Sequence, residues 1–216
     1  MISRVLITGG SGYLGQMFSD LILNTEWNCF STSEKDIDRL IDIISEYKPD
    51  IVIHCGAPSS SDYEDHEFKK ATFNLQKLIE AGKQYSFHLI YPQSAVMYNT
   101  PVESQGYYEM KIRHNKMLNK EASKIKNMNS FTFTQIVFPR VYSADRTKGL
   151  ISRIKSNHIY NWNHKIKFTS KGDCMDFLSE FFERFESNRN LFDSATLVVP
   201  ERYEMSVANI KQFFEI

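Results

Sequence analysis

Short apolar runs alternate with longer segments of helical apolar spacing up to Tyr142. The runs that we predict as strands are Arg4–Thr8, Trp27–Ser31, Ile51–Cys55, Phe87–Tyr91 and Phe131–Phe138, and the segments predicted as helices are Tyr13–Leu23, Asp38–Tyr47, His66–Gly82 and about Tyr107–Lys124. This order is typical of a parallel sheet with helices on both faces. The runs VLIT, IVIH and HLIY lack polar alternation, as strands buried on both sides do. The pattern predicts an α/β fold with a doubly wound parallel sheet.

Beyond Tyr142 the alternation loosens into polar, turn-prone and aromatic segments, which predict a small, irregular C-terminal subdomain. A helix at Asp176–Glu186, a strand at Thr196–Val199 and a helix from Ser206 as N-cap to about Phe214 follow. We expect residues 1–147 to form the main domain and residues 148–216 the smaller region, with about 173–190 returning to the main core. Four phenylalanines at helical spacing predict a core stripe or an oligomer face: Phe177, Phe181, Phe182 and Phe185.

Composition excludes several classes of partner. Lysine plus arginine and aspartate plus glutamate number 26 each, so no net charge favours nucleic acid or an anionic membrane. A small molecule is the better expectation. The three cysteines, Cys29, Cys55 and Cys174, form no C-x-x-C pair and read as reduced packing residues. The N-terminal apolar run is too short for a signal peptide or a membrane span, so we expect a cytoplasmic protein.

A glycine series follows the first predicted strand and leads into a helix. Gly9 permits a tight turn, Gly12 lets a pyrophosphate approach the backbone, and Gly15 lets helix and strand pack closely. The amides that open the helix, at Tyr13 and Leu14, would hold the phosphates. The strand before and the helix after support this interpretation over a plain glycine-rich turn, and they predict a Rossmann-type dinucleotide-binding domain.

The end of the second predicted strand bears on the choice of cofactor. NAD-selective proteins normally place a carboxylate there for the adenosine ribose. Here Ser31, Ser33 and Lys35 occupy the segment, an arrangement that tolerates a 2′-phosphate, so we favour NADP. Glu34 keeps NAD open, and a plain solvent-facing loop is the alternative for the serines.

Five motifs together resemble the extended short-chain dehydrogenase/reductase family of nucleotide-sugar epimerases, dehydratases and ketoreductases. They are the T-G-G-x-G-x-x-G loop at Thr8–Gly15, the P-D-x-V-I-H-x-x-A segment at Pro49–Ala57, S-A-x-x-Y at Ser94–Tyr98, Y-x-x-x-K at Tyr107–Lys111 and P-R-V-Y at Pro139–Tyr142. The segment from Ser31 to Ala57 looks closest to the dTDP-4-dehydrorhamnose reductase branch. The resemblance implies hydride transfer to or from a sugar, with a nucleotide-activated sugar as the expected substrate.

The resemblance also implies roles for individual residues. Tyr107 is the acid/base, Lys111 favours its phenolate from one helical turn away, and Ser94 polarises the substrate oxygen. The implied cofactor-binding set comprises Gly9, Gly12, Tyr13, Leu14, Gly15, Ser31, Ser33, Lys35, Asp36, Cys55, Gly56, Ala57, Lys111, Pro139 and Arg140. A homodimer is a further expectation by resemblance.

The chain departs from the family pattern near the substrate, and the C-terminal substrate subdomain that the resemblance implies is abbreviated relative to typical members. Ser94 and Tyr107 are only 13 positions apart, which shortens the loop between them, and Asn99 and Ser143 stand where relatives have glycines. The motifs do not separate a ketoreductase from an epimerase or dehydratase. A non-catalytic NADP-binding sensor or scaffold of the same fold is the alternative function, in which Tyr107 is a partly buried aromatic residue.

Other polar residues receive structural interpretations. His54 ends a buried strand and is expected to be a hydrogen-bonded core histidine rather than a base. The run Asp62, Glu64, Asp65, His66 and Glu67 reads as the exposed start of a helix rather than a metal site. We therefore predict no metal.

Overall fold

The larger of two sheets contains six strands, all parallel: β1 (Arg4–Thr8), β2 (Asn28–Thr32), β3 (Ile51–His54), β4 (His88–Ser94), β5 (Thr132–Phe138) and β8 (Ala195–Val198). A computed structural model describes residues 3–58, 63–98, 105–123, 131–147 and 149–216. The strand order is β2-β1-β3-β4-β5-β8. The direction of strand addition therefore reverses between β1 and β3, where ligands bind in such sheets. The predicted Rossmann-type α/β fold is confirmed.

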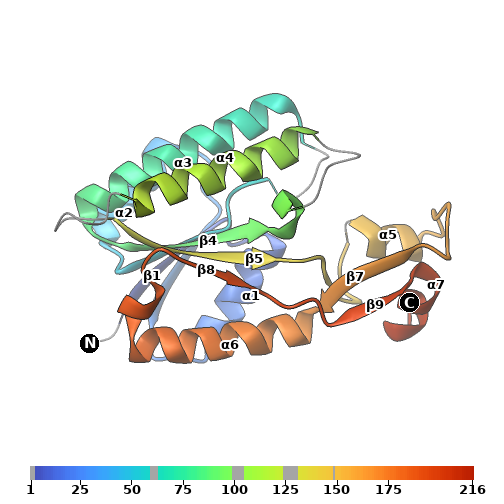
Figure 1. The fold of residues 1–216 in the computed structure, drawn as a ribbon. Coiled ribbons are helices and arrows are strands. Elements are labelled where there is room, and N and C mark those ends of the chain that lie inside the picture. Colours follow the sequence, from blue (N-terminus) through green and yellow to red (C-terminus); the bar gives the residue numbers. More distant parts are fainter. Residues whose placement is uncertain (1–2, 59–62, 99–104, 124–130, 148) are drawn as a thin grey trace.

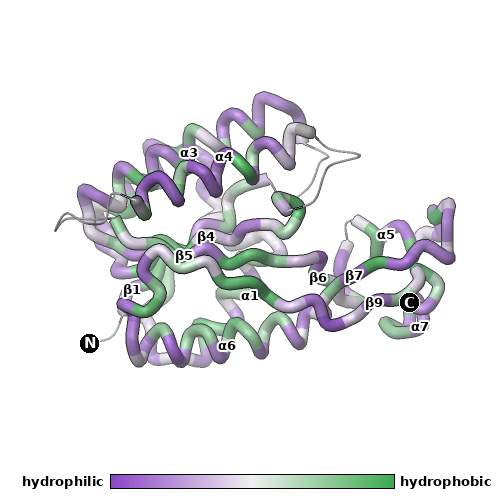
Figure 2. The backbone as a smooth tube through the Cα atoms, in the orientation of Figure 1, coloured by the Kyte–Doolittle hydropathy of each residue, from purple (hydrophilic) through white to green (hydrophobic). Residues whose placement is uncertain are grey.

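Helices cover both faces of this sheet (Figure 1). On one face lie α2 (Ile37–Tyr47), α3 (Asp65–Tyr85) and α4 (Gln105–Ala122), and on the other lie α1 (Tyr13–Ile22) and α6 (Lys171–Ser187). Each face has its own apolar cluster, and the hydropathy colouring places apolar residues on the strands between the helices (Figure 2). Phe181, Phe182 and Phe185 of α6 are buried in the first cluster, so the phenylalanine stripe belongs to the core.

Polar side chains cap the first turns of helices α2 and α3. Asp36 caps α2 by accepting the amide hydrogens of Asp38 and Arg39. Glu64 and Glu67 form a reciprocal capping box at the start of α3, which confirms the acidic run as a helix start. Asp62, the first residue of the acidic run, lies outside the described residues. So does Lys124, the predicted end of the helix that begins near Tyr107.

A second sheet lies beyond the carboxyl ends of the main strands (Figure 1). It comprises β6 (Val141–Tyr142), β7 (Lys165–Ser170) and β9 (Tyr203–Ser206), with α5 (Gly149–Lys155) and α7 (Val207–Phe213) beside it. Strand β7 pairs parallel with β6 and antiparallel with β9. Ser206 caps α7, as predicted, by accepting the Asn209 amide at 3.2 Å. The region predicted as irregular is thus an ordered small sheet.

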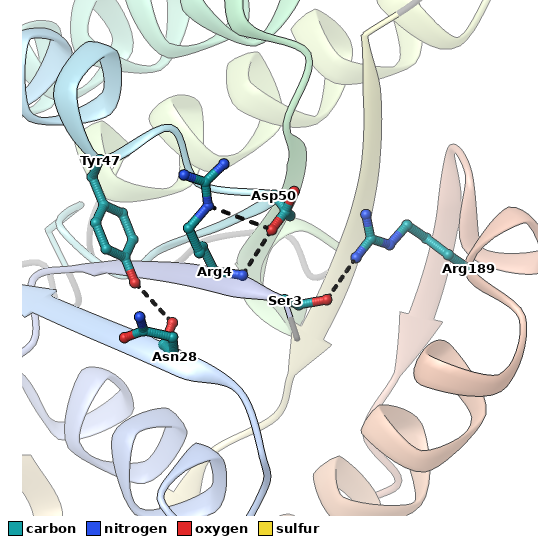
Figure 3. Close-up of polar contacts among 6 residues, drawn as sticks. All are labelled: Ser3, Arg4, Asn28, Tyr47, Asp50 and Arg189. Atoms are coloured by element: carbon teal, nitrogen blue, oxygen red, sulfur yellow. Dashed lines mark hydrogen bonds and ion pairs between the residues drawn. The ribbon is translucent and has the colours of Figure 1, made fainter. Parts of the chain in front are cut away.

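Polar contacts tie together the amino ends of the main strands (Figure 3). The Arg4 amide donates to the Asp50 carboxylate at 2.8 Å, the Tyr47 hydroxyl donates to the Asn28 carbonyl at 2.8 Å, and Arg189 donates to the Ser3 hydroxyl at 3.3 Å. These contacts fix the edge opposite the small sheet and leave the carboxyl edge for a ligand. None of the described helices is both long and apolar enough to cross a membrane.

Candidate active site

The glycine turn after β1 packs against the segment that follows β3. Gly9 has a φ of +68°, and a Cβ there would lie 2.6 Å from the carbonyl carbon of Cys55 and 2.7 Å from the Gly56 nitrogen. A Cβ on Gly15 would lie 2.3 Å from the Gly9 oxygen. Because both close approaches are to backbone atoms, which cannot swing away, only glycine is accommodated at these two positions.

The N-terminus of α1 carries no side-chain cap. Gly12 is the N-cap residue and has no side chain to accept the first amides of the helix. The amide hydrogens of Tyr13 and Leu14 and the positive end of the helix dipole are therefore open to an anion. This arrangement fits the pyrophosphate of a dinucleotide, which would complete the cap.

At the end of β2, both acidic side chains are turned toward backbone amides. The Glu34 carboxylate accepts the amides of Lys35 and Asp36 at 2.8 and 2.9 Å, and these bonds lower its pKa. Asp36 is occupied as the cap of α2. Ser31 lies against the glycine turn, because a Cβ on Gly10 would be 1.9 Å from its hydroxyl oxygen. Ser31 and Lys35, like Ser33, are exposed.

The residues at the carboxyl end of β3 and just after it are neutral. His54 is buried, and its Nδ1 pairs with the Thr8 hydroxyl at 2.6 Å. Burial lowers the pKa of His54 to about 4, which confirms it as a hydrogen-bonded core histidine. Burial also raises the pKa of the Cys55 thiol, against the opposing charge of Lys111. Gly56 and the half-buried Ala57 continue this segment.

Ser94, Tyr107 and Lys111 come together at the carboxyl end of β4. Ser94 is the last residue of that strand, and its side chain hydrogen-bonds that of Tyr107. Lys111 lies one turn further along α4, with its Nζ 5.7 Å from the centre of the Tyr107 ring. The same Nζ donates to the Pro92 carbonyl at 3.4 Å. The fold therefore brings the three residues that the sequence motifs singled out into one cluster.

Burial governs the ionisation of this cluster. It raises the pKa of Tyr107, while the hydrogen bond from Ser94 and the charge of Arg146 act in the opposite direction. It lowers the pKa of Lys111 to about 8 because the ammonium is nearly enclosed. At neutral pH Tyr107 thus carries a proton that it can donate, and Lys111 is still mostly protonated.

A buried polar network beneath the cluster was not predicted. The Tyr91 hydroxyl pairs with His114 Nδ1 at 2.5 Å, and His114 Nε2 pairs with the Thr72 hydroxyl at 3.1 Å. Burial lowers the pKa of His114 to about 2, so the imidazole is neutral. Lys111 Nζ lies 5.3 Å from the centre of the Tyr91 ring. The network joins β4, α4 and α3; the only signal in the sequence is that His114 follows Lys111 by one helical turn.

The segment after β6 contacts the first residue of α1. The Tyr13 hydroxyl pairs with that of Ser143 at 2.7 Å, and the Arg146 guanidinium lies 4.7 Å from the centre of the Tyr13 ring. Sequence reasoning missed Arg146 because it belongs to none of the motifs. Pro139 and Arg140 follow β5, beside the end of β4, and Arg140 is exposed. Asn99 lies outside the described residues.

The sheet and the uncapped glycine turn define a dinucleotide-binding protein of the Rossmann type. Family comparison makes this more specific: the chain belongs to the NAD dependent epimerase/dehydratase family, whose sequence model matches residues 5–173. The resemblance stated from the motifs is confirmed. A nicotinamide dinucleotide is accordingly the class of cofactor, and the family is one of epimerases and dehydratases.

Solved structures share the fold at low sequence identity. The dTDP-4-dehydrorhamnose reductase of Bacillus anthracis str. Ames, in complex with NADP, is 15% identical with a TM-score of 0.72, over 100% of this chain and 82% of that one. The UDP-glucose 4-epimerase of Thermus thermophilus, in complex with NAD, is 14% identical with a TM-score of 0.74, over 97% and 81%. The L-threonine dehydrogenase of Phytophthora infestans is 16% identical with a TM-score of 0.74, over 99% and 82%. A sequence comparison with curated proteins gives no match.

Metal ligation has no visible basis in the described part of the chain. There, no three histidine, cysteine, aspartate or glutamate side chains gather in a way that could hold an ion.

Proposed function

We propose that this protein is an NADP-dependent oxidoreductase that reduces a carbonyl group of a sugar, with a nucleotide-activated 4-ketosugar as substrate. The observation that carries the proposal is the Ser94–Tyr107 hydrogen bond with Lys111 beside it, at the carboxyl end of β4. Cys55 connects this cluster to the cofactor turn, because its backbone touches Gly9 and its thiol is in electrostatic range of Lys111. An epimerase that returns hydride to the opposite face would use the same residues.

In this mechanism each side chain of the cluster has a defined role. The nicotinamide supplies the hydride when the cofactor is bound. Ser94 hydrogen-bonds the carbonyl oxygen and so stabilises the negative charge that develops on it. Tyr107, kept protonated by burial, donates its proton to that oxygen. Lys111 contributes positive charge that favours the resulting phenolate and would hold the nicotinamide ribose.

The preference for NADP rests on the turn after β2. Glu34 and Asp36 both accept backbone amides, so neither carboxylate is directed at a ribose hydroxyl. Ser31, Ser33 and Lys35 are exposed, and their hydroxyl and ammonium groups suit a 2′-phosphate. We also propose a homodimer through the outer surfaces of α3 and α4, which pack side by side over one face of the sheet (Figure 1).

A non-catalytic NADP-binding sensor is the second candidate. One observation that favours it is the hydrogen bond from Lys111 Nζ to the Pro92 carbonyl, which draws the ammonium toward β4. Another is the shortness of the loop between Ser94 and Tyr107.

The test compares Tyr107→Phe with its neighbour Tyr108→Phe. Mass spectrometry of ligands that copurify with the protein first identifies the cofactor, expected to be NADP, and guides a panel of nucleotide-activated ketosugars. Loss of the general acid should lower kcat by about 10²–10⁴-fold in Tyr107→Phe. Tyr108→Phe should stay near the wild-type rate, and both variants should bind NADP as the wild type does.

Undiminished turnover in Tyr107→Phe would show that the assignment of the acid/base is wrong. Tight binding of NADP with no turnover of any sugar in the panel would favour the sensor.

A further inference from the structure

Three consecutive residues of β4 contact Lys111. Its Nζ lies over the Tyr91 ring, 5.3 Å from the ring centre, a distance at which an ammonium and an aromatic face attract each other. The same Nζ donates to the Pro92 carbonyl at 3.4 Å. The Gln93 carboxamide donates to the Lys111 backbone carbonyl at 3.1 Å. The position of the ammonium is therefore set by the strand as well as by its own helix.

The Tyr91 ring is itself anchored. Its hydroxyl pairs with His114 Nδ1 at 2.5 Å, and the two rings meet edge to face with their centres 5.7 Å apart. His114 Nε2 pairs with the Thr72 hydroxyl at 3.1 Å, and that hydroxyl donates to the Phe68 carbonyl at 3.0 Å. Tyr91 and His114 are both fully buried. Hydrogen bonds thus tie the ring beneath Lys111 to α4 and, through it, to α3.

The groups around the ammonium are neutral at pH 7. Burial lowers the pKa of His54 to about 4 and that of His114 to about 2, and it raises the pKa of the neighbouring thiol and phenols. Burial also lowers the pKa of Lys111 to about 8. An aromatic face and a carbonyl oxygen favour the charged form against this effect. The titratable neighbours of Lys111 are His54 and Cys55 from the end of β3, Tyr91 from β4, and Tyr107 and His114 from α4.

We propose that Tyr91 is a positioning residue, whose ring face holds the Lys111 ammonium beside Tyr107. His114 and Thr72 anchor that ring through its hydroxyl. Lys111 Nζ lies 5.7 Å from the centre of the Tyr107 ring, so a change in the support of the ammonium acts next to the proton donor. The proposal rests on the proposed roles of Tyr107 and Lys111, and it adds to them three residues that lie outside the sequence motifs.

The test changes the electron density of the ring while nearly keeping its size. Tyr91→Phe is compared with full-length proteins that carry phenylalanines of increasing fluorination at position 91. Each fluorine withdraws electron density from the ring face and weakens its attraction for a cation. Lysines labelled with ¹³C at Cε are titrated by NMR, with Lys111→Met used to assign the resonance. The Lys111 midpoint should move to lower pH with each fluorine, by roughly one pH unit across the series.

Phe133 is the matched control position. It is fully buried on β5 in the same apolar cluster as Tyr91, but its ring stacks on that of Phe131, with the centres 5.9 Å apart. The same fluorinated phenylalanines at position 133 should leave the Lys111 titration unchanged.

Kinetics provide a second readout. Tyr91→Phe keeps the ring face but loses the anchor to His114, so kcat should fall by roughly three- to tenfold with KM for the sugar unchanged. Sugar reduction needs the charged form of Lys111 to favour the phenolate. The fall of kcat with rising pH should therefore begin at a lower pH as fluorination at position 91 increases.

A Lys111 midpoint that does not follow fluorination at position 91 overturns the proposal, as does one that follows it equally at position 133. The proposed function stands in that case if Tyr107→Phe loses activity. If the midpoint follows fluorination but Tyr107→Phe remains fully active, the proposed function fails while the positioning of Lys111 by Tyr91 stands.

Discussion

His54 shows how a single buried residue links the site to the stability of the fold. Its imidazole pairs with Thr8 across the neighbouring strands β1 and β3, and burial keeps it neutral with a pKa of about 4. In the unfolded chain a histidine has a pKa of about 6.5. Between these two values the unfolded state binds a proton that the folded state excludes, so stability falls as pH decreases.

We therefore predict acid-induced destabilisation that begins near pH 6.5 and continues to about pH 4, with roughly 3 kcal/mol of unfolding free energy lost through His54. Urea unfolding at a series of pH values measures it. His54→Gln keeps a partner for Thr8 but has no proton to bind, so its stability should depend less steeply on pH. His158→Gln, at an exposed position, should keep the wild-type slope. Equal slopes in all three proteins would contradict the argument.

The sequence motifs identified some residues of the candidate site and missed others. Ser94 could be found because it ends a predicted strand. Tyr107 and Lys111 could be found because they lie one helical turn apart in the Y-x-x-x-K motif. Arg146 and His114 could not, because only the fold brings them into contact with Tyr13 and Tyr91, which are distant in the sequence.

Elements were predictable where their apolar pattern is strong. Strands β1, β3 and β5 are buried almost throughout, and the predicted strands agree with them to within one residue. Strands β6, β7 and β9 escaped prediction because β6 has two residues and the others are largely polar or half-exposed. Helix α6 starts five residues earlier than predicted because Ser170 caps it by accepting the Asp173 amide.

Helix α3 contains a glycine that its packing requires. A Cβ on Gly82 would lie 2.3 Å from the Phe131 ring, which is itself packed in the core. Gly82→Ala should therefore destabilise the protein by about 1–3 kcal/mol through overpacking, although alanine favours a helix.

Thermal unfolding of Gly82→Ala and Gly172→Ala measures this requirement. Gly172 lies in the first turn of α6, and a Cβ there would meet its nearest atom, the Ser170 hydroxyl oxygen, at 3.7 Å. Gly172→Ala should leave stability unchanged or raise it by up to about 1 kcal/mol. Equal effects of the two substitutions would show that Phe131 moves aside freely.

On the scale of the whole molecule, the chain passes repeatedly between the two sheets. It runs from β5 into β6 and β7, returns through α6 and β8 to the main sheet, and crosses again into β9 (Figure 1). Backbone hydrogen bonds reinforce the crossings: the Thr169 amide donates to the Arg140 carbonyl at 2.9 Å, and the Val199 amide donates to the Val137 carbonyl at 2.9 Å. The small sheet has an apolar cluster of its own. Its strands are nevertheless joined in the chain to strands of the main sheet, because β6 follows β5 and β9 follows β8.

These crossings predict that both sheets unfold in one cooperative transition, and the two tryptophans can test this. Trp27 packs against Phe182 in the main core, with ring centres 5.4 Å apart, whereas Trp162 packs in the cluster of the small sheet. In Trp27→Phe fluorescence reports the small sheet, and in Trp162→Phe it reports the main core. Within each variant the urea midpoints from fluorescence and from far-ultraviolet circular dichroism should coincide. An earlier fluorescence transition in Trp27→Phe alone would mean that the small sheet unfolds independently of the main sheet.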